Sequence, residues 1–384
     1  MRVVKISLLV LLLVVTSFLV TGCWNYREID RIAIVAGVAI DKGEKEKYKI
    51  TAEIIQVSGG SSPKTTSQLI TMEGNSIFDA ARNGISLTGK RLYWSHNKVI
   101  IISKKIAEKG VVSVMDWYNR DSETRFDVNI LICKGDSASE ILAGKKTTDQ
   151  IKSFELNDMI KNQKSLSKAP QSDMVIFFNA LEGEGIVPAL PTIELKKING
   201  KKLPSIMGTA VFKRDKLVGY LNSKDTKSYL VIKDEIKGGL IVEKVKKKDK
   251  TSPVTLEVFK SKTKVTPIIN GKDVKMSIKI DTETAIDEID GETNVIDDKG
   301  RKKLESLAAE TLKTQVEDVI KKVQKEYGAD IFGFGSKVNQ KDPEVWKRIG
   351  NDWDKKFKNL EVSVDAKVHI RNSAMLSKPL KVGE

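Results

Sequence analysis

The hydrophobic pattern begins with an apolar run of fifteen residues, Ile6 to Val20, broken by only three hydroxyl side chains. Arg2 and Lys5 lie before the run, and Thr21-Gly22-Cys23 follows it. The run is shorter than the ~20 apolar residues of a membrane-spanning helix, and its flanks are those of an export signal. A hydrophobic and two small residues before a cysteine are typical of a bacterial lipoprotein cleavage site. We therefore expect residues 1–22 to be removed and Cys23 to carry a diacylglyceryl anchor.

Two other interpretations of this segment stay open. One is an uncleaved anchor helix that extends through Trp24, and the other is an ordinary signal peptide followed by a coincidental cysteine. Charge, length and cleavage site agree best with the lipoprotein signal. No later stretch of the sequence is long and apolar enough to span a bilayer, so lipid is the only membrane attachment that we expect.

Residues 23–197 mix strand-like and helix-like patterns and predict an N-terminal α/β domain. Ile32–Ile40 is a continuous apolar run, as in a strand buried on both faces, and Tyr48–Ile54 alternates apolar and polar residues. Asn75 or Ser76 is a suitable cap for a helix that begins at Ile77. The remaining expected elements are strands at Val99–Ile102 and Phe126–Cys133, a helix over Val111–Tyr118, and a helix behind a capping box at Ser137–Glu140.

Two further domains are expected after a boundary near residue 197, marked by prolines and a polar stretch. Residues 198–238 form a small middle domain with a β-hairpin, and residues 239–384 form a C-terminal α+β domain with an antiparallel sheet. An amphipathic helix covers residues 304–327 and ends at Gly328. Asp342-Pro343-Glu344 opens another helix, and residues 361–371 alternate as a half-buried strand. The predicted fold class is α+β, in a three-domain, lipid-anchored extracytoplasmic protein with mixed or antiparallel sheets and packed helices.

The charge of the chain is strongly basic, with a formal net charge of +15, which becomes 15 − 2 = +13 once Arg2 and Lys5 are removed. Such a surface attracts anionic phospholipid headgroups and binds nucleic acid non-specifically. An exported, tethered protein meets lipid first, so we expect no nucleic-acid partner. A simply solvated Lys-rich surface is an equally good interpretation. Cys133 has no disulfide partner if Cys23 is acylated, and its strand-like surroundings predict a buried structural thiol.

The sequence contains no motif typical of a catalytic, metal or cofactor site. There are two histidines, His96 and His369, and no His or Cys spacing that fits a zinc site. No G-x-S-x-G nucleophile elbow occurs, and Gly84–Lys90 has P-loop spacing but is followed by Arg91 instead of Ser or Thr. We predict that the protein is not an enzyme and needs no cofactor or metal.

Several stretches occur in a specific order over nearly the whole mature chain. They are Gly22–Asp30, Tyr93–Ile100, Arg120–Arg125, Gly208–Phe212 with Leu217-Val218-Gly219, and Asp330–Gly335 followed by Trp346, Trp353 and Phe357. Together they resemble the Ger(x)C family, the lipoprotein C subunits of spore nutrient-germinant receptors. One departure is Asp225-Thr226, where the family pattern has Glu-Thr.

The resemblance implies a role and no reaction. It implies a lipoprotein on the outer face of the spore inner membrane, acting with a membrane-embedded A subunit and a permease-like B subunit in nutrient-triggered germination. Its motif residues are candidates for partner contacts or for structural roles. Trp24, Arg27 and Glu28 would orient the first folded segment under the lipid, and His96 would be a hydrogen-bonding partner within the fold. Arg120, Glu123 and Arg125 would form an internal ion-pair network or a polar contact with the A subunit.

Two other functions are compatible with an exported, lipid-anchored protein. A lipid-anchored extracytoplasmic solute-binding protein would need a deep cleft between domains with converging polar groups. It ranks lower because the sequence shows no long doubly wound βαβ succession. An exported hydrolase ranks last, since neither a nucleophile nor a metal constellation is visible.

Overall fold

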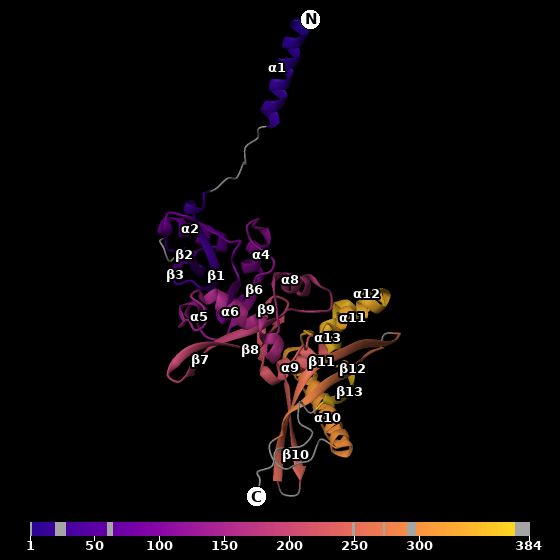
Figure 1. Ribbon diagram of the computed structural model, residues 1–384. Helices are drawn as coiled ribbons and strands as arrows, with labels where there is room; N and C mark the ends of the chain where they lie inside the picture. The colour runs from indigo at the N-terminus through magenta and orange to yellow at the C-terminus, as the bar shows by residue number, and fades with distance from the viewer. Residues whose placement is uncertain are drawn as a thin grey trace.

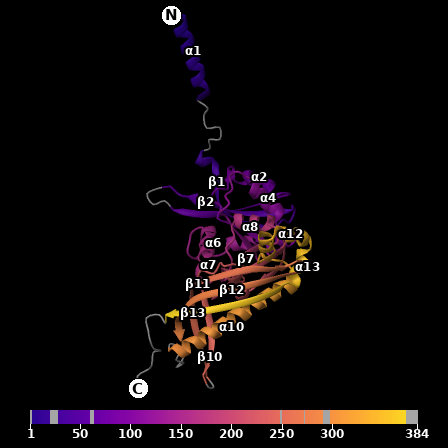
Figure 2. The same ribbon diagram turned by 90° about the vertical axis from the view of Figure 1, so that its right-hand side faces the viewer.

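The computed structural model describes residues 2–19, 28–59, 64–247, 250–271, 273–289 and 297–372. The apolar leader forms helix α1 (Arg2–Leu19), and a short 3₁₀ turn (Ile29–Arg31) begins the folded body. Within these ranges, no helix combines the length and the apolar content needed to cross a membrane. The body contains two β-sheets, each covered by helices (Figures 1 and 2). The α+β class with mixed sheets is confirmed.

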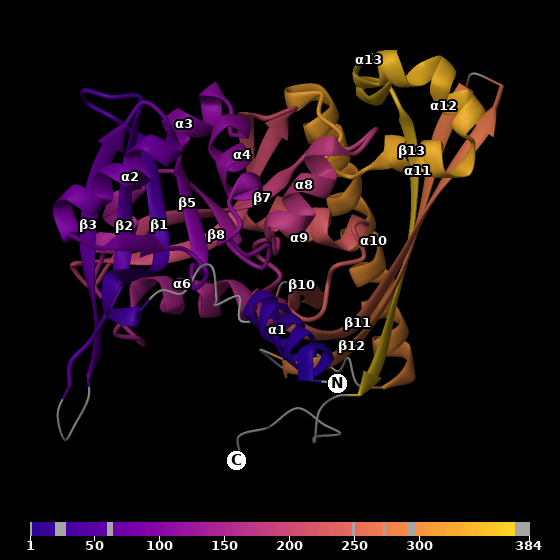
Figure 3. The same cartoon turned by 90° about the horizontal axis from the view of Figure 1, so that it is seen from above.

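The first sheet has nine strands in the order β3-β2-β1-β5-β6-β7-β8-β9, with β4 paired to β1. Figure 3 shows β3, β2, β1 and β5 side by side. The central strands β1, β5, β6 and β7 run parallel, and the outer pairs are antiparallel. The bounds are β1 (Ile32–Lys42), β2 (Tyr48–Val57), β3 (Thr65–Gly74), β4 (Arg91–Tyr93), β5 (Val99–Ser103), β6 (Asn129–Cys133), β7 (Ala189–Ile198), β8 (Lys201–Lys213) and β9 (Lys216–Leu221).

Helices cover both faces of this sheet, which is why its central strands are continuous apolar runs. In β5, Ile100 and Ile102 belong to one core cluster, whereas Val99 and Ile101 belong to another on the opposite face. The bounds of the helices are α2 (Ile77–Thr88), α3 (Lys104–Lys109), α4 (Val112–Arg120), α5 (Ser139–Ala143), α6 (Lys152–Lys161), α7 (Gln163–Leu166), α8 (Met174–Glu182) and α9 (Ser223–Ile232). The helix capped by Ser76 and the helix that buries Val114, Met115 and Tyr118 are both confirmed.

The segment expected to form a middle domain contributes two strands to the first sheet. The expected boundary at residue 197 falls inside the β7–β8 hairpin, whose turn is Asn199-Gly200. Strands β8 and β9 form the predicted hairpin around Lys213–Lys216, and this hairpin continues the same sheet. The ends of β7 and β8 next to the turn are exposed, so they carry the lysines and polar residues that suggested a boundary.

The second sheet has four strands in the order β10-β11-β12-β13. Its elements are β10 (Leu240–Lys247), β11 (Lys250–Asn270), β12 (Asp273–Ile289) and β13 (Glu361–Asn372). The first three strands are antiparallel, as predicted, but β13 pairs parallel with β12. The last strand runs parallel to its neighbour because a helical crossover separates β12 from β13 and returns the chain in the same direction.

Helix α10 (Asp298–Lys322) packs along this sheet (Figure 2). It buries one apolar stripe, Leu304, Ala308, Leu312, Val316, Val319 and Ile320, whereas Leu307 is 38% exposed. It widens into a π-turn at Val323–Tyr327 and ends at Gly328, whose φ of 55° is left-handed. The crossover continues through α11 (Phe334–Lys341), α12 (Pro343–Ile349) and α13 (Trp353–Lys358). The cap at Asp342 is confirmed, but the single helix expected there is broken into two by a 3₁₀ turn at Gly350–Asp352.

Candidate functional site

A loop after α8, residues 183–187, docks onto the loop that follows α10, residues 330–336. The amide of Val187 donates to the carbonyl of Asp330 at 3.1 Å, and the amide of Ser336 donates to the carbonyl of Gly185 at 3.0 Å. Gly185 has φ 68°, and a Cβ atom there would lie 2.4 Å from the carbonyl carbon of Gly335. The two backbones therefore meet at a distance that only glycine permits. We call this contact the junction.

Asp330 organises one side of the junction. Its buried carboxylate accepts hydrogen bonds from the amides of Gly333 (2.9 Å), Phe334 (3.2 Å) and Gly335 (2.8 Å). It also accepts from the indole nitrogen of Trp353 at 2.9 Å. Burial raises the pKa of Asp330 to about 6, although these four donors act in the opposite direction. The carboxylate thus caps α11 and ties α13 to the same loop.

Glu184 organises the other side. Its carboxylate accepts from the indole nitrogen of Trp346 at 2.6 Å and from the side-chain amide nitrogen (Nδ2) of Asn339 at 3.0 Å. The ring of Trp346 packs on that of Trp353, with centroids 5.4 Å apart. Glu184 therefore joins the segment after α8 to the helices of the crossover through the indole of Trp346, which packs on the indole that Asp330 holds.

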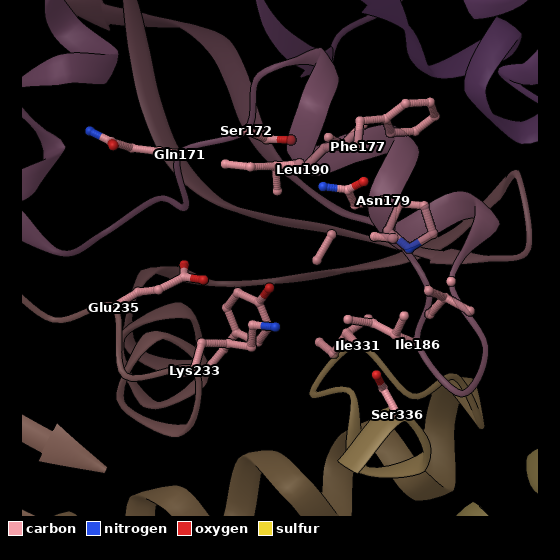
Figure 4. A pocket seen from close by; sticks show the side chains of 17 residues that line it. Gln171, Ser172, Phe177, Asn179, Ile186, Leu190, Lys233, Glu235, Ile331 and Ser336 are labelled. Carbon is pink, nitrogen blue, oxygen red and sulfur yellow. The ribbon is translucent and has the colours of Figure 1, made fainter. Parts of the chain in front are cut away.

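A cavity of about 290 Å³ lies beside the junction. It is enclosed by α8 and the start of β7 on one side, by the end of α9 on another, and by Ile331 and Ser336 on the third (Figure 4). Its polar groups include Ser172, Lys233 and Glu235. Burial raises the pKa of Glu235, and the nearby Lys233 and Lys237 partly oppose that shift. Burial also raises the pKa of Tyr229, so its hydroxyl remains neutral at physiological pH.

The motif residues expected from the sequence gather at a different place, around α4 and β4. The hydroxyl of Ser95 donates to the carbonyl of Glu123 at 2.8 Å, and Arg91 pairs with the carboxylate of Glu123 at 3.1 Å. His96 is exposed, with its ring 6.2 Å from that of Tyr93. The structure thus brings the segments around His96 and Glu123 together.

The charged residues of this motif region pair with three different partners. Arg120 pairs with Asp116 at 2.8 Å, and Arg125 pairs with Asp127 at 2.8 Å, while Glu123 meets Arg91. The side chains of Arg120 and Arg125 are 76% and 57% exposed. Pairs so open to solvent contribute little to stability. Both arginines therefore remain on a surface that a partner can reach.

The predicted anchor region lies largely outside the described residues. This holds for Cys23, Trp24 and Arg27. Glu28 is described, and its carboxylate lies 3.4 Å from Arg31 in the next turn of chain. Cys133 is free and buried, and burial raises the pKa of its thiol to about 11, as expected of a structural cysteine.

Buried carboxylates elsewhere in the first sheet serve as caps. Asp41 accepts from the amides of Ala138 (2.7 Å) and Ser139 (2.9 Å) at the start of α5. Glu53 accepts from the amides of Lys152 (2.8 Å) and Ser153 (2.7 Å) at the start of α6. The expected capping box at Ser137–Glu140 was therefore wrong, because Asp41 supplies the acceptor for this helix end. Among the described residues, no group of three or more His, Cys, Asp or Glu side chains could hold a metal ion.

Regions that match known protein families cover nearly the whole chain. Residues 25–195 match the spore germination protein N-terminal domain, and residues 207–374 match the spore germination B3/GerAC-like C-terminal domain. The chain belongs to the Ger(x)C family of spore germination proteins. Among its Ger(x)C relatives, spore germination protein KC of Bacillus subtilis is 23% identical, with 98% of each chain covered. Spore germination protein YndF of Bacillus subtilis is 27% identical, covering 91% of this chain and 93% of that protein.

The crystal structure of the GerBC protein has the same fold. It matches with a TM-score of 0.56 at 21% identity, covering 88% of this chain and 97% of GerBC. The two Ger(x)C regions meet within the first sheet, since the N-terminal region ends in β7 and the C-terminal region begins in β8. The junction cavity is lined from both regions, by α8 and β7 on one side and by α9, Ile331 and Ser336 on the other.

The sequence identified the Asp330–Gly335 loop as one that needs glycine, but not the loop on which it docks, residues 183–187. It also missed the cavity residues Ser172, Lys233 and Glu235. The loop had a local signal, an aspartate followed by two glycines. The cavity had none, because its polar residues come from segments about sixty residues apart that only the fold brings together.

Proposed function

We propose that this chain is a non-enzymatic lipoprotein subunit of a spore germinant receptor. It would be held through Cys23 on the outer face of the spore inner membrane and would act with the membrane-embedded A subunit and the permease-like B subunit. The observation that carries this proposal is the coverage of the chain by both Ger(x)C regions. Its role would be to assemble the receptor or to pass on the signal, through surfaces and not through chemistry.

The disposition of charged groups supports a role without catalysis. The buried carboxylates of Asp41, Glu53 and Asp330 are all engaged by backbone amides, so they hold the fold together. The one described cysteine, Cys133, is buried with a raised pKa and is therefore a poor nucleophile. Exposed charge is found instead on surfaces such as the one with Arg120 and Arg125, which suits contact with a partner.

The end of the body next to the anchor supports attachment close to a membrane. Four residues separate Cys23 from Glu28, so five residue steps of extended chain would keep the body within roughly 18 Å of residue 23. A groove of about 680 Å³ lies at the beginning of β1 and is lined by apolar side chains such as Ile32 and Ile55 and by polar ones such as Gln68 and Lys90. Val57 and Leu87 on its rim are 69% and 61% exposed. An apolar rim of this kind fits the acyl boundary of a bilayer.

The test compares Cys23→Ala with Cys133→Ala in spores. We expect Cys23→Ala to abolish fatty-acid labelling of the protein, to release it from spore inner membranes, and to prevent co-purification with the A and B subunits. Germination in response to nutrients should fall with it. Cys133→Ala is the matched control, because it removes the other sulfur and should leave labelling and location unchanged. Normal germination of spores that lack this protein and any paralogue would contradict the proposal.

The alternative, a lipid-anchored extracytoplasmic solute-binding protein, is favoured by one observation. The junction cavity lies where segments of both Ger(x)C regions meet and has converging polar groups, as a solute site requires. The parallel strands β5, β6 and β7 are also joined by helical crossovers, which the sequence did not reveal. Deletion of the A and B subunits distinguishes the two functions. A solute-binding protein would keep its function without these subunits, whereas a receptor subunit would lose it.

A further inference from the structure

Strand β3 forms an open edge of the first sheet. It pairs with β2 over its full length, and in the described part of the chain its other side pairs with no strand. Figure 3 shows β3 as the outermost strand beside β2. Helix α2 covers the end of the strand, where the side-chain amide of Asn83 donates to the carbonyl of Glu73 at 2.9 Å. The preceding residues, Thr65–Met72, present an edge about 27 Å long whose outward backbone N–H and C=O groups are free to pair with another strand.

The other outer strands have the protection that sheet edges in globular proteins normally have. Helix α3 packs against β9, and the amide of Val111, just after this helix, donates to the carbonyl of Asp215 at 3.0 Å. Strand β10 contains three lysines, and β13 has charged side chains at four of its exposed positions. Covering helices and charged residues keep edge strands from pairing with other chains. Over Thr65–Met72 the described chain supplies neither.

The open part of β3 is uncharged. Charged residues make up 30% of the chain, but neither a charged residue nor a proline occurs from Thr65 to Met72. The acid that follows, Glu73, is turned toward its own chain, because its carboxylate accepts from the three backbone amides of residues 44–46 at 3.1–3.3 Å. A strand that meets this edge would therefore meet no opposing charge on β3 itself.

The absence of charge matters most for pairing with a second copy. In an antiparallel pair of identical strands, residues near the centre lie opposite themselves or a close neighbour, so a charged strand would oppose like charges. Leu69 lies near the middle of the open edge and is 36% exposed, so it would add an apolar contact there. The cation that reaches this strand, Lys146, donates to the hydroxyl of Ser67 at 2.8 Å, and that hydroxyl donates to the carboxylate of Glu53. This cation is therefore balanced by an acid of its own chain.

We propose that β3 pairs antiparallel with β3 of a second copy of this chain and joins the two nine-stranded sheets into one. The copies would be related by a two-fold axis perpendicular to the sheet, which gives a closed dimer. Such an axis turns the same face of both sheets to the same side. The groove whose lining includes Gln68 and Ile70 would lie on that side in both copies, and both Cys23 anchors of the proposed function would reach one membrane. The pairing itself does not depend on the anchor.

The first experiment is sedimentation equilibrium of the full-length chain in a density-matched detergent, for which we expect a reversible monomer–dimer equilibrium. Gln68→Lys/Leu69→Lys places four lysines near the two-fold axis. It should raise the dissociation constant by roughly tenfold, since like charges opposite each other in a sheet are destabilising. Val242→Lys/Ile268→Lys is the matched control, because it adds the same two charges at exposed positions of the second sheet and should leave the equilibrium unchanged.

Two outcomes would overturn the proposal. A chain that stays monomeric at submillimolar concentration would leave this edge to a strand of another protein. A dimer unaffected by Gln68→Lys/Leu69→Lys would place the contact elsewhere, as in association through the apolar leader. Thermal unfolding confirms that each variant is folded.

A cross-link locates the contact. Gln68→Cys, at an exposed position of β3, should give a covalent dimer with a short bismaleimide. Phe78→Cys is the control, because residue 78 is 47% exposed on α2 and lies away from the open edge. The chain without an added cysteine gives the background from Cys23 and Cys133. Equal cross-linking at residues 68 and 78 would refute the pairing of β3. Neither experiment uses the A and B subunits or the lipid, so failure here and failure of the proposed receptor role are distinguishable.

Discussion

At the scale of single residues, this protein uses carboxylates as long-range caps. Asp41 and Glu53 each accept backbone amides from a helix about one hundred residues later in the chain. Asp330 does the same locally, and binds Trp353 as well. Local patterns cannot reveal a cap that is distant in sequence, and this explains why Ser137 was expected to cap α5. Ser76, by contrast, caps the helix that begins directly after it, by accepting from the amide of Asp79, and this local cap was predicted.

Replacement of Asp330 by alanine should destabilise the protein strongly. The change leaves the buried amides of Gly333, Phe334 and Gly335 without their acceptor, and each unsatisfied group costs about 1–3 kcal/mol. We expect a loss of more than about 3 kcal/mol in the free energy of unfolding, measured by urea denaturation. Asp342→Ala is the control: Asp342 caps α12 through one bond to Val345, so its loss should cost about 1 kcal/mol. Equal losses for the two variants would show that Asp330 has no special role.

At the scale of elements, hydrophobic periodicity predicted the segments that bury one or two faces. The alternating strand β13, the buried strands β1 and β5, and the stripe of α10 were all found in this way. Strand β3 was missed, because it is an edge strand whose first half is largely exposed and therefore has no clear alternation. The break between α12 and α13 was missed as well, since Trp346, Ile349, Trp353 and Phe357 fit one helical face and are all buried.

The docking of the two junction loops gives a prediction for Gly185. Gly185→Ala should both strain a left-handed backbone and place a Cβ 2.4 Å from the carbonyl carbon of Gly335. Gly89→Ala is a closely matched control, because Gly89 has φ 66° but nothing within 4 Å of the added Cβ. The control should cost only the backbone strain, on the order of 1 kcal/mol. Gly185→Ala should cost clearly more in the free energy of unfolding and should speed proteolysis of the loops at residues 183–187 and 330–336. Identical behaviour of the two variants would mean that the close approach is not needed.

At the scale of the whole molecule, the two Ger(x)C regions are not separated by a cleft through the sheet. The first sheet runs across the boundary between the regions, from β7 into β8, and the junction loops add a second connection. The order of motifs along the chain was enough to predict the family, because that order is a property of the sequence. The junction cavity was not predictable, since Ser172, Glu235 and Ser336 become neighbours only through the packing of both regions.

The proposed orientation at the membrane can be tested with two single labels. In Figures 1 and 2 the β1–α2 end of the body and strand β10 lie at opposite ends. Leu87 and Val242 are 61% and 57% exposed, so Leu87→Cys and Val242→Cys should both accept a polarity-sensitive fluorophore. The native Cys133 should stay unlabelled, because it is buried and its thiol has a pKa of about 11.

On vesicles that contain anionic lipid, with the chain anchored through Cys23, the fluorescence of the label at residue 87 should shift to the blue and be quenched by lipid-borne quenchers. The label at residue 242 should report water, because the length of the body holds β10 away from the bilayer. Quenching at residue 242 but not at residue 87 would reverse the orientation, and it would contradict the placement of the groove at the beginning of β1 against the membrane.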